Sequence, residues 1–287
     1  MFSVDEHLQD LKRKALKLKI DLLNLLNEKK YGYSGSCLSA LELMVGLYYG
    51  INHDKPFFYC DAKKPGSIDQ DYFVLGKGQI APLWYLVLSD LGFFDKSEID
   101  DFVKVGGRLQ GRAGLKIPGV HVSAGSFSEG LGQAVGLAIG LKMERKKNKV
   151  FCLGGDAELS RGEVWEAAMV AGHMKLDNLI LIVDKNGIKI DEVVKNNVFM
   201  EPINEKFDSF GWKSINVYNG HDFDEILGAY LKALTLTRFP VVIVAKTVKA
   251  KGVGFAEGKQ VYQNKPLGDE ELEEAIKVLE KQLSLIS

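Results

Sequence analysis

Hydrophobic residues along this chain occur in two patterns, short continuous runs and longer stretches with a helical repeat. Apolar positions recur at every third or fourth residue over 81–91, 163–174 and 222–234, which predicts helices. The short runs are rich in β-branched and aromatic residues and predict buried strands: YFVL from Tyr72, VFCL from Val150, LILIVD from Leu179, SINVY from Ser214 and VVIVAK from Val241. Because strands that alternate with helices build βαβ units, we predict an α/β fold, a doubly wound parallel sheet flanked by helices.

Two further segments have a helical pattern. Ser3 and Glu6 have the spacing of a capping box, and the apolar repeat that follows, up to Leu25, predicts one amphipathic helix. From Ser128, the stretch SEGLGQAVGLAIGLK places several glycines inside a helical pattern, although each interior glycine costs roughly 1 kcal/mol relative to alanine. Small residues allow close approach, so we expect this helix to pack tightly against a neighbouring helix, within the subunit or across a dimer axis.

Composition and charge exclude several classes of protein. The net charge of −1 argues against nucleic acid or an anionic membrane as the main partner, because such binding depends on neutralising phosphates. The glycine-rich segment is too short to span a membrane and is followed by KMERKKNK. Three cysteines without paired spacing and an acidic N-terminus, unlike a signal peptide, predict a cytoplasmic protein.

Polar, glycine-rich sequences follow the predicted strands, where ligands bind in sheets of this kind. The stretch GGDAE, Gly154 to Glu158, ends one strand with an aspartate beside glycines, and DKNG follows the next strand. Glycines allow a phosphate to approach the backbone, whereas Asp156 needs a cation to bridge it to an anion, and magnesium is the natural choice. Asn186 or Asp184 would supply the second ligand. Alternatively, Asp156 caps the helix that starts near Arg161 and Asn186 forms a left-handed (αL) turn.

A longer match supports the magnesium interpretation. The stretch GGDAELSRGEVWEAAMVAGHMKLDNLILIVDKNGIKID, Gly154 to Asp191, resembles the thiamine diphosphate motif of transketolases. The similarity extends to CLSALELMVGLYYG, FVLGKGQIAPLWYLVL, VSAGSFSEGLGQAVGLAIGLK and VVIVAKTVKAKGVGF, and so covers nearly the whole chain. It implies a single diphosphate-binding domain over residues 1–287, with 256–287 as a C-terminal extension or helix.

The resemblance also implies roles for individual residues. Thiamine diphosphate and Mg²⁺, or Ca²⁺ or Mn²⁺ in its place, would be the cofactors. Asp156, Asn186 and the carbonyl of Ile188 would bind the metal. The other cofactor-binding positions would be Gly155 and Ala157 at the diphosphate, Gly125 and Phe127 at the aminopyrimidine, Ile190 near the cofactor, and Lys249 and Lys265 near its channel. Where the family motif has a second glycine, Ala157 narrows the space over the diphosphate.

In transketolases a pyrimidine-binding domain follows and carries the glutamate that contacts the aminopyrimidine. The resemblance therefore implies a split enzyme whose second subunit supplies that glutamate, in an α2β2 assembly that acts on sugars or sugar phosphates. Arg161 stands where the family commonly has an interface glutamate, so either the partner provides a carboxylate or Arg161 faces solvent. We favour the partner contact.

The histidines of the family active site are replaced. Tyr33, Gln79, Arg112 and Gln263 stand at histidine positions of the family and are the candidate substrate-facing residues, while no residue of the chain is a certain catalytic group. His173 and His221 match family histidines whose role is structural. Because glutamine and arginine do not transfer protons near neutral pH, proton handling must differ. A different substrate, with a negative group facing Arg112, proton transfer through the cofactor's own amino group, or loss of catalysis would each explain this.

The sequence thus predicts the cofactor-binding subunit of a transketolase-like enzyme that transfers a two-carbon ketol unit between sugars or related carbonyl compounds. Another thiamine-dependent carboligase or decarboxylase subunit is the alternative within enzymes. A noncatalytic scaffold, bound to its partner through the glycine-rich helix, is the alternative outside them.

Overall fold

Five parallel strands form the centre of the computed structural model, which describes residues 4–123, 125, 127–188, 200–262 and 265–286. The strands are β3 (Tyr72–Leu75), β4 (Val150–Gly155), β5 (Leu179–Lys185), β6 (Lys213–Val217) and β7 (Val241–Lys246). They lie in the order β3-β4-β5-β7-β6, and each pair is parallel. The predicted parallel sheet is therefore confirmed, and all five predicted runs belong to it.

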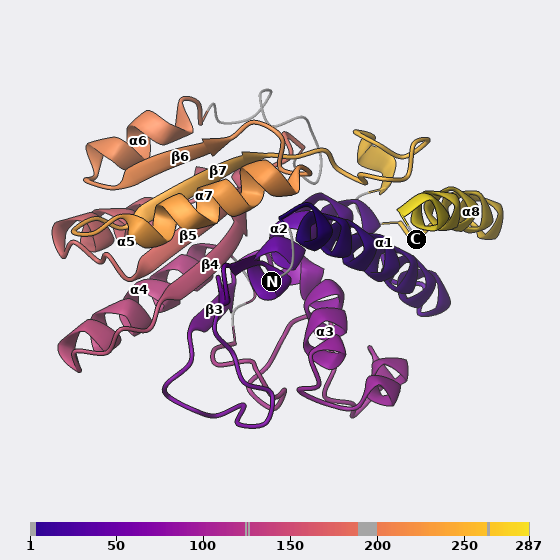
Figure 1. Ribbon diagram of the computed structural model, residues 1–287, viewed down its shortest axis with the longest axis horizontal. Coiled ribbons are helices and arrows are strands. Elements are labelled where there is room, and N and C mark those ends of the chain that lie inside the picture. Colours follow the sequence, from indigo (N-terminus) through magenta and orange to yellow (C-terminus); the bar gives the residue numbers. More distant parts are fainter. Residues whose placement is uncertain (1–3, 124, 126, 189–199, 263–264, 287) are drawn as a thin grey trace.

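Helices cover both faces of this sheet (Figure 1). One face packs against α4 (Phe127–Met143), α5 (Gly162–His173) and α6 (Ile203–Ser209), and the other against α1 (Val4–Glu28), α2 (Ser34–Tyr49), α3 (Ala81–Asp90) and α7 (Phe223–Thr235). Successive side chains of a strand point to opposite faces, so Ile182 and Val183 join different hydrophobic cores. Burial on both faces explains why the strands are continuous apolar runs.

The remaining elements lie outside the sheet. Helix α8 (Asp269–Ile286) lies beside α1, where Figure 1 shows the two helices side by side, and Leu279 of α8 is buried in the core that α1 shares. A two-stranded antiparallel hairpin, β1 (Ile51–Asn52) and β2 (Lys55–Pro56), was not predicted from the sequence. The capping box expected at Ser3 lies outside the described residues. No helix in the described part of the chain is both long and apolar enough to cross a membrane.

The glycine-rich helix α4 makes one close contact at its start and exposes glycines further along. A Cβ atom on Gly130 would lie 2.7 Å from Cα of Gly76, so this glycine allows α4 to approach the end of β3. At Gly132, Gly136 and Gly140 an added Cβ would meet no atom within 4 Å. Helix α4 packs against the neighbouring helix α5 within the chain, as one of the two expected alternatives had it, but the close approach at a glycine is to the end of β3, and these three glycines face outward.

Candidate functional site

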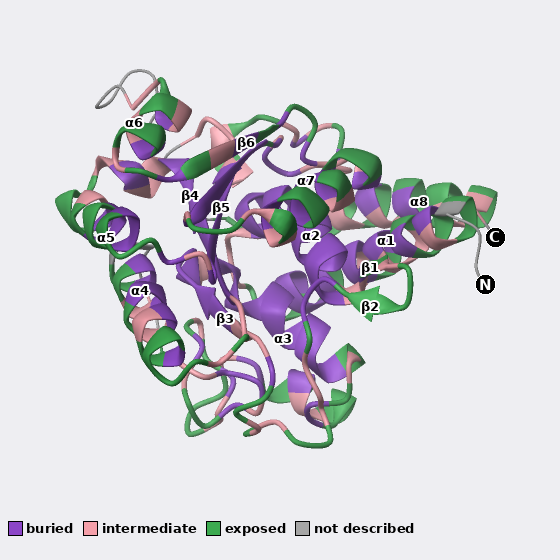
Figure 2. Ribbon diagram, turned by 60° about the vertical axis from the view of Figure 1, so that its left-hand side comes forward, coloured by how far each residue is buried: buried purple, intermediate pink, exposed green. Residues whose placement is uncertain are grey.

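A cavity of about 350 Å³ opens at the carboxyl ends of the strands. It lies next to the 3-10 helix Asp156–Ser160, which follows β4, and next to the N-terminus of α2. Figure 2 shows that β4 and β5, the strands that end beside the cavity, are almost entirely buried. The lining combines positions predicted from the sequence with others that were not: Tyr33, Ser36, Lys77, Gln79, Arg112, Gly125, Gly155, Asp156, Ala157, Glu158, Ser160, Arg161, Asn186, Ile188 and Lys249.

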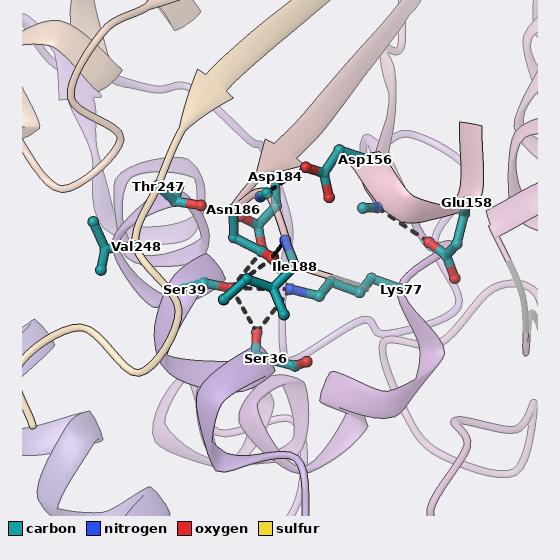
Figure 3. Close-up of polar contacts among 12 residues, drawn as sticks. Ser36, Ser39, Lys77, Asp156, Glu158, Asp184, Asn186, Ile188, Thr247 and Val248 are labelled. Atoms are coloured by element: carbon teal, nitrogen blue, oxygen red, sulfur yellow. Dashed lines mark hydrogen bonds and ion pairs between the residues drawn. The ribbon is translucent and has the colours of Figure 1, made fainter. Parts of the chain in front are cut away.

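Asp184, at the end of β5, is fully buried and tied to three other elements (Figure 3). Its carboxylate forms an ion pair with Lys77, accepts a hydrogen bond of 2.6 Å from Ser39 Oγ, and accepts another from Thr247 Oγ1. Burial alone would raise the pKa of Asp184, but the ammonium group of Lys77 and these hydrogen bonds outweigh it and lower the pKa. Since both of its oxygens are engaged, Asp184 is a structural anchor and a poor candidate for a metal ligand.

Asp156, one strand away, is 3% exposed but lines the cavity. Its Oδ2 accepts a hydrogen bond of 2.8 Å from the backbone of Gly187, and in the described part of the chain it forms no ion pair, although the charge of Lys77 lies near enough to lower its pKa somewhat. Burial, followed by the negative charge of Asp184, raises the pKa of Asp156 to about 6. A cation bound in the cavity would favour the ionised carboxylate and so offset this shift.

Lys249 brings the opposite charge to the same cavity. It follows β7, is 1% exposed, and its ammonium group has no hydrogen-bond or ion-pair partner among the described residues. Burial, followed by the positive charge of Lys77, lowers the pKa of Lys249 to about 7. An anion in the cavity would restore the charged form.

Asp156 and Lys249 thus line one cavity without forming an ion pair, and each has a pKa shifted toward its neutral form. A ligand that carries both signs of charge, such as a divalent cation bound to a diphosphate, would satisfy both groups. Gly155, beside Asp156, contributes no side chain to the space above β4. The residues present therefore fit a metal diphosphate.

Asn186 and Ile188 lie at the same edge of the sheet as Asp156 (Figure 3). The side-chain oxygen of Asn186 accepts a hydrogen bond of 3.1 Å from the backbone N–H of Ile188, while its amide group donates to Asp184 at 3.4 Å. Asn186 does not have the left-handed backbone that the alternative interpretation expected, and no side chain of the described residues caps α5, so that interpretation is wrong on both points. Asn186 belongs to the lining that contains Asp156.

The structure describes three of the four candidate substrate-facing residues. Tyr33, Gln79 and Arg112 line the cavity, and Arg112 Nε donates to the carbonyl of Gly125 at 3.2 Å. Tyr33 immediately precedes α2 with a left-handed backbone, φ 70°, which is uncommon for a non-glycine residue. No histidine is among the described lining residues. The candidates Ile190 and Gln263 lie outside the described residues, as does the side chain of Phe127.

Two further residues predicted from the sequence, Arg161 and Lys265, lie in different places relative to the cavity. Arg161 is exposed and lines the cavity mouth, whereas Lys265 is exposed and is not part of the lining. Of the lining residues that the sequence analysis had not singled out, Lys77 stands in the strand-end sequence GKGQ, which provided a signal. For Ser36 and Glu158 the sequence contained no signal apart from the motifs beside them. In the structure, Glu158 accepts a hydrogen bond of 3.1 Å from the backbone of Gly155.

Comparisons with known proteins agree with this geometry. Residues 12–282 match the family described as transketolase, thiamine diphosphate binding domain. The chain is 31% identical to a 6-deoxy-6-sulfo-D-fructose transketolase subunit of Clostridium sp. (strain MSTE9), over 95% of this chain and 97% of that protein. It is 33% identical to an apulose-4-phosphate transketolase subunit of Actinobacillus succinogenes, over 90% of this chain and 91% of that protein.

Among solved structures, transketolase from Campylobacter jejuni superposes with a TM-score of 0.85 at 29% identity. The match covers 99% of this chain and 43% of that one, so the similarity lies in one part of the longer enzyme. The fold and the strand-end cavity define a cofactor-binding α/β protein. The chain belongs to the transketolase family of transferases and corresponds to its thiamine diphosphate binding domain.

Proposed function

We propose that this chain is the thiamine diphosphate and Mg²⁺ binding subunit of a two-subunit transketolase, which transfers a two-carbon ketol unit between sugars or related carbonyl compounds. The observation that carries the proposal is the pair of unneutralised, opposite charges, Asp156 and Lys249, in one cavity at the strand ends. The similarity to named transketolase subunits over almost their full length supports it.

In this proposal Asp156, Asn186 and the carbonyl of Ile188 hold the metal ion. Gly155 and Ala157 lie against the diphosphate, and Lys249 neutralises part of its charge. Bound thiamine diphosphate supplies a nucleophilic carbon that also acts as an electron sink. Lys77 and Asp184 keep the floor of the cavity rigid, so that Asp156 is held at the strand end whether or not the metal is bound.

The second subunit would bring the glutamate for the aminopyrimidine ring, in an α2β2 assembly. Two observations support a subunit interface: Arg161 is exposed at the mouth of the cavity, and elsewhere on the surface the outward glycines of α4 can be approached closely by another backbone. Three free cysteines in the described structure agree with a cytoplasmic location.

We infer that the substrate differs from that of histidine-bearing relatives. Tyr33, Gln79 and Arg112 can hydrogen-bond a substrate, and Arg112 adds a permanent positive charge. The two relatives described above are named for sugars with a sulfonate or a phosphate group. A sugar whose anionic group is bound by Arg112 is therefore the substrate class that we propose.

Calorimetric titration of the chain with thiamine diphosphate, with and without Mg²⁺, tests the cofactor site. We expect Mg²⁺-dependent binding that Asp156→Asn abolishes. Asp71→Asn is the matched control, because Asp71 precedes β3 at the opposite end of the strand and accepts hydrogen bonds from the backbones of Tyr59 and Lys149. Equal binding to the Asp156→Asn protein would contradict the proposal.

Reconstitution with the second subunit tests the activity. We expect ketol transfer when both subunits, thiamine diphosphate and Mg²⁺ are present, and none when one of the two proteins is left out. Cofactor binding without transfer to any sulfonated, phosphorylated or neutral sugar would favour another thiamine-dependent carboligase. A stable complex that binds no cofactor would favour the scaffold alternative.

A further inference from the structure

A second cluster of buried charges lies outside the cavity and consists of Lys19 on α1, Glu42 on α2 and His221 in the turn before α7. Lys19 Nζ lies 2.6 Å from Glu42 Oε1, and His221 Nδ1 lies 2.9 Å from Glu42 Oε2. All three side chains are 6–7% exposed, and none of them lines the cavity. Three buried ionisable groups need a function or a structural reason, since burial of charge is costly.

The hydrogen bonds of His221 define its tautomer. Its Nε2 lies 2.8 Å from the backbone N–H of Val248, which can only donate, so Nε2 accepts and carries no proton. The proton of the neutral ring is then on Nδ1 and is donated to Glu42 Oε2. Burial would raise the pKa of Glu42, but Lys19 and His221 outweigh it, so that Glu42 stays ionised as the acceptor.

Val248 lies between two residues of the site, Thr247 and Lys249. Figure 3 shows Val248 beside Thr247 where the chain leaves β7. Thr247 Oγ1 donates to the anchored Asp184, and the backbone N–H of Ala250 donates to the carbonyl of Gly35 at 3.1 Å. Between these two residues, the backbone N–H of Val248 is held by His221, and the carbonyl of Lys249 accepts a hydrogen bond of 2.9 Å from the backbone N–H of Gly258.

The position of Lys249 depends on this segment. Its ammonium group has no partner in the described part of the chain, so no side-chain bond holds it. Packing leaves little space, since a Cβ on Gly35 would lie 3.0 Å from Cγ of Lys249. Lys19 lies near the chain just after this segment, since a Cβ added to Gly252 would lie 3.2 Å from its Nζ. The buried cluster thus holds the segment at Val248 and lies beside Gly252.

We propose that His221, oriented by Glu42 and Lys19, is a positioning residue that holds Val248 and thereby places Lys249 in the cavity for an anionic ligand. His221 does not touch the ligand and acts through the backbone of residues 247–250. Only the identity of the anion, the diphosphate of the cofactor, rests on the proposed function.

The first test measures amide hydrogen exchange of residues 247–250 in the full chain without ligand. His221→Phe removes the acceptor, so we expect faster exchange in this segment and unchanged exchange in β5. His221→Gln can supply a neutral acceptor and should restore part of the protection. His173→Phe is the matched control, because His173 is exposed at the end of α5. Unchanged exchange at 247–250 in the His221→Phe protein would overturn the proposal.

The second test measures binding of magnesium pyrophosphate, and separately of thiamine diphosphate with Mg²⁺. We expect His221→Phe to weaken binding about tenfold, comparable to the loss of one hydrogen bond, and His221→Gln to weaken it less. In a Lys249→Met background, His221→Gln should have no further effect, because its influence passes through Lys249. Additive effects of the two substitutions would overturn the proposal.

The two tests separate this inference from the proposed function. If the wild-type chain binds pyrophosphate but not thiamine diphosphate, the cofactor assignment fails and the positioning role stands on the pyrophosphate data. If both ligands bind and His221→Phe alters neither exchange nor affinity, the positioning role fails alone. Should His221→Phe not fold, His221→Gln and Glu42→Gln carry the same comparison.

Discussion

Asp156 and Asp184 are two aspartates at the ends of neighbouring strands, and both are almost inaccessible to solvent, yet their pKa values move in opposite directions. Asp184 has an ammonium group and two hydroxyl groups within the chain, whereas Asp156 has backbone donors and a second negative charge nearby. Burial is therefore not what distinguishes them. The chain itself supplies the counter-charge of Asp184, whereas a counter-charge for Asp156 would have to come from a ligand.

The largest expected effect follows from a substitution at Asp184, whose charge is neutralised within the chain. Asp184→Asn leaves the buried Lys77 ammonium without a counter-charge, and we expect the free energy of unfolding to fall by about 3–5 kcal/mol. Urea denaturation at pH 7 measures this change. Adding Lys77→Met removes the unpaired cation and should recover part of the loss; a double variant less stable than Asp184→Asn would argue against a paired role.

A substitution at Asp156 is expected to change the free energy of unfolding in the opposite direction. Asp156 has a pKa of about 6 in the folded chain and an ordinary value of 3.8, so folding favours its protonated form. Its destabilising contribution is absent below pH 3.8, grows as pH rises, and is complete above pH 6. At pH 7 Asp156→Asn should therefore stabilise the metal-free chain by up to about 3 kcal/mol, because two pKa units correspond to that amount.

The pH dependence provides the check on that prediction. Urea denaturation without divalent ions should give the full gain at pH 7 and only a small part of it at pH 4, where the folded state is protonated and the unfolded state, with a pKa of 3.8, is close to half protonated. Saturating Mg²⁺ with thiamine diphosphate should reverse the order at pH 7, since only the wild-type aspartate gains from the metal. A loss of stability in the metal-free Asp156→Asn protein at pH 7 would contradict the assigned cause of the shift.

The smallest expected effects on stability concern two glycines of helix α4, one facing open space and one in close contact with the end of β3. Gly136 faces open space, so Gly136→Ala should stabilise the isolated chain by up to about 1 kcal/mol through helix propensity. Gly130→Ala should destabilise it, because the new Cβ would lie 2.7 Å from backbone atoms of Gly76. Thermal denaturation of the two variants measures both signs. If the second subunit covers this face, Gly136→Ala should weaken its binding in titrations.

The sequence predicted the parts of this molecule that depend on local pattern. Buried parallel strands are apolar on both faces, so the runs from Val150 and Leu179 were visible as strands, and the polar residues after them led to Asp156 and Asn186. The transketolase resemblance added Lys249, whose surroundings come from residues far along the chain. The Tyr33, Gln79 and Arg112 positions likewise required the family pattern.

Contacts across long sequence distances were not predictable in this way. Lys77 and Asp184 are 107 residues apart, and Glu42 and His221 are 179 apart. Whether two such side chains meet depends on the strand order β3-β4-β5-β7-β6 and on where α2 crosses the strand ends. The sequence left Asp184 open as a metal ligand for this reason, because its charge was visible and its partners were not.

The ion pair between Lys77 and Asp184 has a consequence for how this family can vary. A change at one of these positions leaves an unpaired buried charge, so we expect selection against single replacements even though neither residue is expected to touch the substrate. The two positions should therefore change together in evolution, and Asp184 should lose its charge in descendants whose residue 77 is neutral. Substrate-facing positions such as Gln79 and Arg112 carry no such constraint and can diversify one at a time.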